Sequence, residues 1–192
     1  MRFRSQKFLT EHIKSILDFY EPNIVDSSGG FFQNFKDDGS LFDTGSRHLV
    51  SSCRMVFNYC KASELFGDDS YREYAQHGLD YIRAWHWDEA RQGYNWTLQE
   101  GHVADDQTNH CYGLAFVMLS AAAAHELGLE GARDDIVRAW NIMESRLWDS
   151  AIDLYADEAT SDWSEVGSYR GQNANMHSCE ALIAAFEATG DE

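Results

Sequence analysis

The sequence predicts an all-α protein of the α/α toroid class, a ring of helical hairpins, with about three hairpins in this chain. First, the segment at 84–96 aligns with the segment at 145–157 at an offset of 61 residues (145 − 84). Second, Gly67, Gly128 and Gly190 lie 61 and 62 residues apart, each after a helical pattern where a left-handed cap is favoured. Third, a single proline occurs among the 192 residues, which suits a helical protein.

Two kinds of helix alternate along the chain. One kind is small and apolar on nearly all sides, so it is predicted to be buried as an inner helix; its ranges are 47–66, 109–127 and 173–189. The other kind is amphipathic and is predicted to cover the inner helices from outside; its ranges are 70–86 and 132–147. An amphipathic helix also begins near the N-terminus, with Phe8, Ile13, Ile16 and Leu17 on one face.

The connections after the outer helices combine aromatic alternation with Gly or Asp turn signals. They cover 29–42, 92–104 and 154–163, and each is predicted to contain a short β-hairpin. Because no linker or low-complexity stretch interrupts the chain, residues 1–192 are predicted to form a single domain.

Composition excludes several classes of partner. The net charge of −17, from 32 acidic and 15 basic side chains, argues against nucleic acid and anionic membrane surfaces. The longest apolar tract, 114–124, is too short to span a bilayer, and no secretory signal pattern is present. The four cysteines form no CxxC pair and lie in apolar helical stretches, so we expect reduced, buried cysteines in a cytoplasmic protein.

No cofactor or metal is predicted. There is no Gly-rich phosphate loop, GxSxG elbow or HExxH motif. His102 and His110 flank a loop with Asp105 and Asp106, but their spacing matches no standard metal site. The other histidines, His12, His77, His86 and His125, fall on outer or surface helical positions and are expected to have no role.

Successive inner helices of such a ring run parallel, so their N-termini should gather at one end. Polar groups begin each inner helix: Arg47 with His48, Asn109 with His110, and the stretch 173–177. Aromatic residues of the connections are expected to rim this end, namely Phe31, Phe32, Trp96 and Trp163. Aromatic walls with a few polar groups are the usual lining of a small-molecule pocket.

Each candidate residue has a structural alternative. Asn173 and Asn175 are either helix caps or ligand contacts. His177 and Glu180 lie three residues apart on one helix face, and Glu180 either binds a ligand or orients His177. Arg47 is placed in a first helical turn, where a cation opposes the helix macrodipole, so a functional role is favoured for it.

Three segments together resemble the N-acylglucosamine 2-epimerase superfamily: "SRHLVSSCRMVFNY" (46–59), "DDQTNHCYGLAFVMLSAA" (105–122) and "YRGQNANMHSCEALIAAFEATGD" (169–191). The superfamily includes cellobiose 2-epimerases and cofactor-free aldose–ketose isomerases acting on mannose and related hexoses. The resemblance runs from about residue 15 to the last residue and is greatest to the mannose isomerase branch.

The resemblance implies a ring of six helical hairpins with a sugar at its centre, and proton transfer at C2 through an enediolate without a cofactor. It further implies that Arg47 holds substrate oxygens and that His177 aids ring opening or sugar binding. Asn173 and Tyr112 match positions that contact substrate hydroxyls. Isomerisation and 2-epimerisation stay open, since they differ only in where the proton returns.

Three repeats occupy this chain, whereas six would need about twice the length, so the chain is predicted to be the N-terminal half of a barrel. The family's main acid–base histidines would then lie outside it, and open edges would expose apolar surface. Two alternatives follow: a non-catalytic sugar-binding or assembly module that closes the ring with a partner or as a homo-oligomer, and a glycoside hydrolase. The hydrolase would need paired acids, for which Asp105, Asp106 and Glu165 are available.

Overall fold

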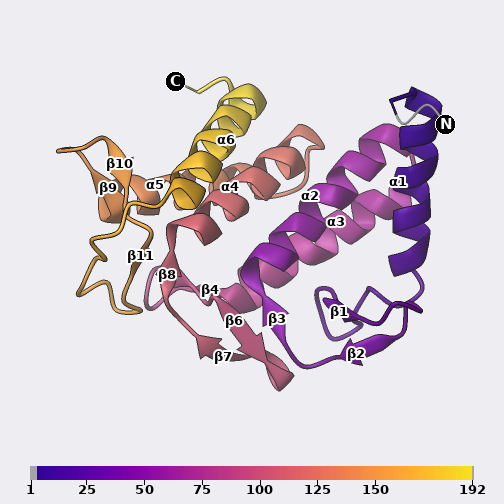
Figure 1. The fold of residues 1–192 in the computed structure, drawn as a ribbon, viewed down its shortest axis with the longest axis horizontal. Coiled ribbons are helices and arrows are strands. Elements are labelled where there is room, and N and C mark those ends of the chain that lie inside the picture. The colour runs from indigo at the N-terminus through magenta and orange to yellow at the C-terminus, as the bar shows by residue number, and fades with distance from the viewer. Residues whose placement is uncertain (1–3, 192) are drawn as a thin grey trace.

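The computed structural model describes residues 4–191 and is built mainly from α-helices (Figure 1). The α-helices are α1 (Gln6–Tyr20), α2 (Leu49–Phe66), α3 (Asp69–Tyr81), α4 (Cys111–Glu126), α5 (Ala132–Ile142) and α6 (Gln172–Thr189). One π-helical turn extends each outer helix: η1 (Ile82–His86) follows α3 and η3 (Met143–Leu147) follows α5. The predicted inner and outer helices are therefore present, with ends within a few residues of those expected.

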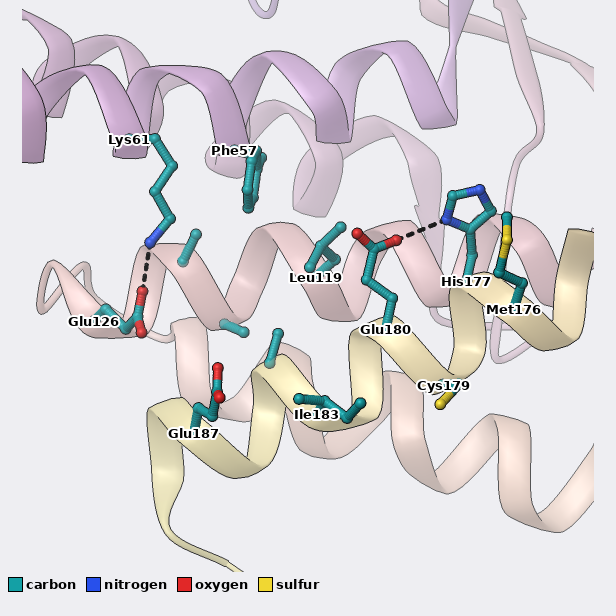
Figure 2. Close-up of a pocket in the computed structure, with 13 residues that line it drawn as sticks. Phe57, Lys61, Leu119, Glu126, Met176, His177, Cys179, Glu180, Ile183 and Glu187 are labelled. Atoms are coloured by element: carbon teal, nitrogen blue, oxygen red, sulfur yellow. Dashed lines mark hydrogen bonds and ion pairs between the residues drawn. The ribbon is translucent and has the colours of Figure 1, made fainter. Parts of the chain in front are cut away.

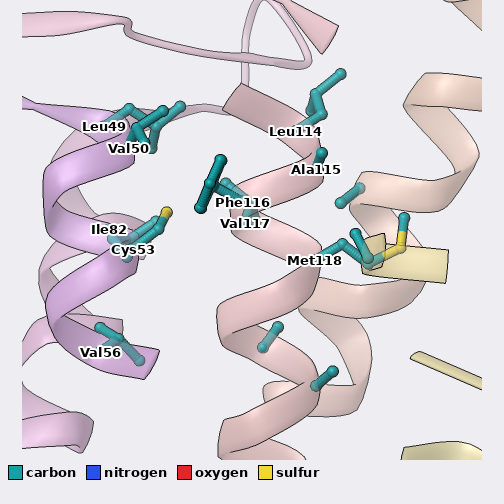
Figure 3. Packing of buried hydrophobic residues seen from close by; sticks show 14 of the residues in the cluster. Leu49, Val50, Cys53, Val56, Ile82, Leu114, Ala115, Phe116, Val117 and Met118 are labelled. Atoms are coloured by element: carbon teal, nitrogen blue, oxygen red, sulfur yellow. The ribbon is translucent and has the colours of Figure 1, made fainter. Parts of the chain in front are cut away.

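Helix α4 is the centre of the molecule. It packs against α2, α5 and α6, while α3 packs against α2. Buried residues occupy all sides of α4, from Cys111 through Ala124, because small alanines allow close approach of its neighbours. Figure 3 shows the layer between α2 and α4, where Val50 and Cys53 of α2 lie opposite Phe116 and Val117 of α4.

Short hairpins join the helices, and those predicted near 29–42 and 92–104 are present, whereas the strands within 154–163 pair with residues outside that segment. The antiparallel pairs are β1 (Asn34–Phe35) with β2 (Leu41–Asp43), β4 (Trp87–Asp88) with β5 (Gly93–Tyr94), β6 (Thr97–Gln99) with β7 (Val103–Asp106), and β9 (Trp148–Asp149) with β10 (Leu154–Tyr155). A short 3₁₀ turn, η2 (Glu100–His102), connects β6 to β7. The β1–β2 and β6–β7 hairpins lie at the end of the molecule where α2 begins (Figure 1).

Two strand pairs were not predicted, and they correct the expected helix starts. β3 (Arg47–His48) precedes α2 and pairs with β6, and β8 (Asn109–His110) precedes α4 and pairs with β11 (Glu158–Ala159). Each entry to an inner helix is thus extended and hydrogen-bonded to the connection of the next unit, which continues with Leu49 N–H donating to Trp96 O at 3.0 Å. Arg47 therefore lies in a strand, and not in a first helical turn.

The glycines that follow the inner helices adopt the left-handed conformation, as predicted. Gly67 and Gly190 are the C-caps of α2 and α6, with φ of 66° and 70°, and Gly128 follows α4 with φ of 68°. A side chain is disfavoured at such angles, so glycine ends these helices with little strain.

Three burial predictions were wrong. Phe31 is fully buried against Tyr59, so it belongs to the core and does not rim the end of the ring. His86 is fully buried because η1 turns its ring inward, where Asn95 O lies 2.8 Å from Nδ1. Cys179 is exposed on the open side of α6, whereas Cys53, Cys60 and Cys111 are buried as expected.

The two edges of the helical array expose apolar side chains. Helix α6 buries only one narrow face, and Ile183 and Phe186 are 54% and 52% exposed. At the other edge α1 exposes Ile13 and Ile16. No helix within residues 4–191 is long and apolar enough to cross a membrane.

Candidate functional site

A cavity of about 450 Å³ opens at the end of the ring where α2 and α4 begin, and we call it the mouth cavity. Its polar lining comes from the β1 region, from β3, from the first turns of α2, from the β6–β7 hairpin and from α4. The lining residues are Gln33, Asn34, Ser46, Arg47, His48, Val50, Ser51, Arg54, Trp96, Thr97, Gln99, Asp105 and Tyr112. Of the three polar clusters predicted to gather at this end, Arg47 with His48 lines the cavity, whereas those at 109–110 and 173–177 do not. Of the predicted rim aromatics, Trp96 lines it and Phe31, Phe32 and Trp163 do not.

A second hollow of about 760 Å³ runs along the open side of α2, α4 and α6, and we call it the axial groove. Figure 2 shows His177 and Glu180 near one end of the groove and Lys61 with Glu126 at the other. Between them the lining is apolar, with Phe57, Leu119, Ala122, Ala123, Ile183 and Ala184.

Four side chains join the two hollows. Arg54 donates a hydrogen bond from Nη2 to Tyr112 Oη at 3.0 Å, and its guanidinium lies 4.6 Å from the Phe116 ring centroid. The His177 ring contacts both aromatic rings, at 5.2 Å from Tyr112 and 4.9 Å from Phe116. The arginine, tyrosine and histidine therefore form one contiguous polar-aromatic cluster.

The internal repeat explains why these residues meet. Arg54, Phe116 and His177 occupy equivalent positions in α2, α4 and α6, at offsets of 62 and 61 residues (116 − 54 and 177 − 116). Equivalent positions of parallel helices around one axis point toward that axis, so a different side chain at each one creates an asymmetric site on a symmetric frame.

Arg54 was missed by the sequence analysis. It is exposed, and among residues 4–191 no carboxylate lies within ion-pair distance of its guanidinium. The available signal was a lone arginine in a helix whose neighbours are almost all small or apolar. A cation placed there without an acidic partner is typical of a binding site.

His177 is oriented by its neighbour on α6. Its Nδ1 lies 2.8 Å from Glu180 Oε2, and its side chain is 19% exposed while that of Glu180 is 55% exposed. When the carboxylate accepts from Nδ1–H, the neutral ring carries its lone pair on Nε2, which can then accept a proton or a hydrogen bond. The sequence left open whether Glu180 orients His177, and this bond favours that reading.

Arg47 lines the mouth cavity but is held by the protein. Nη2 lies 2.5 Å from Asp26 Oδ2, and Nη1 donates to Thr44 O and Ser46 O at 2.8 and 2.9 Å. Burial raises the pKa of Asp26, but hydrogen bonds from Ser28 and Arg47 outweigh it, so that pKa is lowered overall. Arg47 thus has structural partners and lies in a strand before α2, so the helix-macrodipole argument for its functional role does not hold.

The third repeat contains the same clamp. Arg170 donates to Asp149 Oδ2 at 3.0 Å and to Gly167 O and Tyr169 O, and both partners of the ion pair lie 123 residues after Arg47 and Asp26 (170 − 47 and 149 − 26). Since the two sites share the same bonds, the same ion pair ties the residue before an inner helix to the segment that follows an outer helix in both repeats.

The two asparagines at the start of α6 differ. Asn175 is structural: its side chain accepts from Tyr155 N–H and donates to Tyr155 O and Gly171 O. Asn173 is exposed, and within the described part of the chain it makes no hydrogen bond through its side chain. It is the repeat equivalent of Tyr112 at an offset of 61 residues (173 − 112). Its contact with a sugar hydroxyl stays a prediction.

Two histidines flank the aromatic wall of the mouth. The ring centroids of His48 and His110 lie 4.3 and 4.1 Å from that of Trp96. Burial is the main cause that lowers the pKa of both histidines below the usual value, so both rings are favoured in the neutral form.

Each acidic side chain near the mouth cavity accepts hydrogen bonds from its own set of neighbours. Asp105 accepts from Thr97 Oγ1 and Gln99 Nε2 at 3.1 and 3.0 Å, and Asp106 accepts from Thr108 N–H at 2.8 Å. Within residues 4–191 no group of three His, Cys, Asp or Glu side chains is placed to hold a metal ion.

Known proteins resemble this chain over its whole length. Residues 30–192 match the N-acylglucosamine 2-epimerase (GlcNAc 2-epimerase) family. A D-mannose isomerase of Marinomonas mediterranea is 47% identical over 187 residues, which are 97% of this chain and 47% of that protein. The chain thus spans about half the length of the curated relatives it matches.

Solved structures of similar proteins have the same fold as this chain. A crystal structure of D-mannose isomerase superposes with a TM-score of 0.95 at 46% identity, covering all of this chain and 48% of that one. The cellobiose 2-epimerase of Spirochaeta thermophila superposes with a TM-score of 0.86 at 20% identity, over 100% of this chain and 52% of that one, and shows the shared fold. With this fold, the matching residues 30–192 and a relative that is nearly half identical, the chain belongs to the N-acylglucosamine 2-epimerase family.

Proposed function

We propose that this chain is the sugar-holding half of a cofactor-independent isomerase or 2-epimerase acting at C2 of a hexose. Mannose–fructose interconversion is the leading reaction, because the relative named D-mannose isomerase is the most similar of those compared above. The observation that carries the proposal is the cluster of Arg54, Tyr112 and His177 between the mouth cavity and the axial groove.

The residue types in this cluster suit proton transfer next to a carbonyl. Removing the proton from C2 of an open-chain aldose moves negative charge onto the carbonyl oxygen and gives an enediolate. A cation that lies beside this oxygen stabilises the charge as it develops. Returning a proton to C1, with the hydroxyl proton of O2 passing to O1, gives the ketose, whereas returning the proton to the other face of C2 gives the epimer.

We assign the cationic role to Arg54, because its guanidinium has no carboxylate partner in the described part of the chain and lies between Tyr112 Oη and the Phe116 ring. Tyr112 then contacts a sugar hydroxyl, and Asn173 remains a second proposed hydroxyl contact. The role first predicted for Arg47 becomes that of a positioning residue, which holds the β3 strand through Asp26.

His177 is proposed to act on the sugar through Nε2, with Glu180 fixing its orientation. A neutral imidazole that has an accepting Nε2 can remove a proton from a hydroxyl, as ring opening of a hexose requires. Because relatives are about twice as long, further acid–base groups of the complete site are expected from residues outside those present here.

A titration of the protein with mannose, monitored by NMR, tests this proposal. We expect saturable binding of mannose at millimolar concentrations and loss of that binding in Arg54→Met. Incubation in deuterated water reports chemistry in the same sample, through exchange at C2 of mannose or appearance of fructose. Absence of saturable binding by mannose and fructose would contradict the proposal.

The exposed edges support a second candidate function, an assembly module that closes the ring with another copy or a partner. Ile13 and Ile16 of α1 and Ile183 and Phe186 of α6 lie on opposite edges of the helical array, exposed to solvent. Sedimentation velocity over a range of concentrations tests it. A concentration-dependent dimer favours this candidate, and a monomer at all concentrations counts against self-assembly.

A further inference from the structure

His48 differs from its repeat equivalent in ways that suit binding. His48 and His110 both precede an inner helix as its N-cap residue. His48 Nδ1 accepts a hydrogen bond from Val50 N–H at 3.1 Å, whereas His110 makes no cap bond and its Nδ1 lies 3.6 Å from Glu158 Oε2. Only His48 of this pair lines the mouth cavity, beside Arg54.

The cap bond determines the tautomer of His48. Because Nδ1 accepts a hydrogen bond, the proton of the neutral ring is on Nε2. Burial lowers the pKa of His48, and the charges of His110 and Arg54 lower it further, so the neutral ring is favoured. In the described chain no protein atom accepts from Nε2, and this atom is not among the buried polar atoms without a partner, so it is accessible to solvent.

A buried polar network fixes the backbone of His48. Gln33 brackets the residue: its Oε1 accepts from His48 N–H at 2.7 Å and its Nε2 donates to His48 O at 3.2 Å. Gln33 Nε2 also donates to Ser52 Oγ at 3.0 Å, and Ser52 Oγ lies 3.4 Å from Nε2 of the buried His86. Such a network costs desolvation energy, and it leaves His48 with little freedom to move.

The ring of His48 also packs on an aromatic wall. Its plane is inclined by 67° to that of Trp96, with centroids 4.3 Å apart. A fixed N–H donor next to a partly buried aromatic ring that lines a cavity suits a sugar, whose C–H groups pack on the ring while its hydroxyls pair with polar groups.

We propose that His48 is a further sugar-binding residue, whose Nε2–H donates a hydrogen bond to a hydroxyl of the hexose held against Trp96 in the mouth cavity. This inference rests on the proposed function and deepens it. It assigns to His48 the recognition of a hydroxyl and not the transfer of a proton.

His48→Asn separates the two roles of the side chain. The Asn oxygen can take over the cap bond from Val50 N–H, but the donor at Nε2 is lost. We expect an unfolding midpoint close to that of the unchanged chain, and a Kd for mannose that rises about 3- to 10-fold, as for one neutral hydrogen bond. His48→Gln restores a donor near Nε2 and loses the cap, so affinity should recover while stability falls.

His110→Asn is the matched control, and its Kd for mannose should change by less than about twofold, since it removes no donor from the mouth cavity. If the unchanged chain binds no mannose, the proposed function fails and this inference falls with it. If the unchanged chain binds and His48→Asn binds equally well, only the role of His48 is overturned. The same holds if His48→Gln recovers no affinity, or if ¹⁵N NMR places the proton of His48 on Nδ1.

Discussion

Arg47 and Arg54 lie seven residues apart and are held in opposite ways. The Arg47 side chain is 3% exposed and its guanidinium bonds to Asp26 and to two carbonyl groups. Arg54 is exposed, and its guanidinium donates to Tyr112 Oη and lies over the Phe116 ring, with no ion pair to a carboxylate among residues 4–191. A buried cation that is paired with a carboxylate stabilises the fold, whereas one without an anionic partner is available to a ligand.

Methionine substitutions should therefore separate stability from binding. Arg47→Met leaves a partly buried Asp26 carboxylate unpaired, and we expect a loss of about 3 kcal/mol in the free energy of unfolding. Arg54→Met should change that free energy by less than about 0.5 kcal/mol. It should nevertheless weaken mannose binding by about tenfold or more, since the lost bonds are to a charged group.

Urea denaturation and a mannose titration on both variants make this comparison. Arg170→Met is the matched control, because it breaks the equivalent ion pair at a more exposed site and should cost about 1 kcal/mol. The assignment would be reversed if Arg47→Met were as stable as the unchanged chain and bound no mannose.

The sequence could identify part of the candidate site and not the rest. His177 and Glu180 were predicted to share a helix face, and they form a hydrogen bond, because their spacing of three residues is local. Arg47 was misjudged because its partner, Asp26, lies 21 residues away and is brought near only by folding. Arg54 could not be identified for a related reason: only the folded structure shows that no carboxylate among the described residues pairs with it.

At the scale of elements, the helices were predictable and the strands between repeats were not. Helices α2 and α4 follow from periodicity within one segment, which is a local property. Strands β3 and β8 consist of two residues each and exist because β6 and β11 of the following units pair with them. A pairing between distant segments of two residues has no periodic signal, so the sequence assigned these residues to the helices they precede.

A substitution at Gly78 of α3 tests how closely this helix packs against its neighbours. A Cβ at this position would lie 2.3 Å from Phe31 Cε2 and 2.7 Å from Val56 Cγ2, both on fully buried side chains. Alanine favours a helix over glycine by about 1 kcal/mol. Overpacking in a rigid core costs about 1–3 kcal/mol, so we expect Gly78→Ala to lower stability despite its propensity.

Thermal and urea denaturation of Gly78→Ala measure this balance. Glu73→Ala, at an exposed position of the same helix, serves as the control and should shift the free energy of unfolding by less than about 0.5 kcal/mol. A Gly78→Ala variant that gains about 1 kcal/mol would mean that α3 moves freely relative to α2.

At the scale of the whole molecule, three histidines make the fold sensitive to acid. Burial is the main cause that lowers the pKa of His48, His86 and His110, and that of His86 falls to about 4. The ordinary pKa of histidine is about 6.5, so the unfolded chain takes up protons before the folded chain does. Stability is therefore complete above about pH 6.5 and is lost as pH falls toward 4.

His86 should dominate this loss, since a pKa lowered from 6.5 to about 4 corresponds to about 3 kcal/mol. Urea midpoints measured between neutral pH and pH 4 should fall steadily in the unchanged chain. His86→Leu removes the titrating group and leaves Ser52 and the Asn95 carbonyl without it, so this variant should be less stable at neutral pH and show a flatter pH dependence. His12→Gln, at an exposed position on α1, should keep the original slope. An equal slope in His86→Leu would place the acid sensitivity in groups other than this buried ring, with His48 and His110 among them.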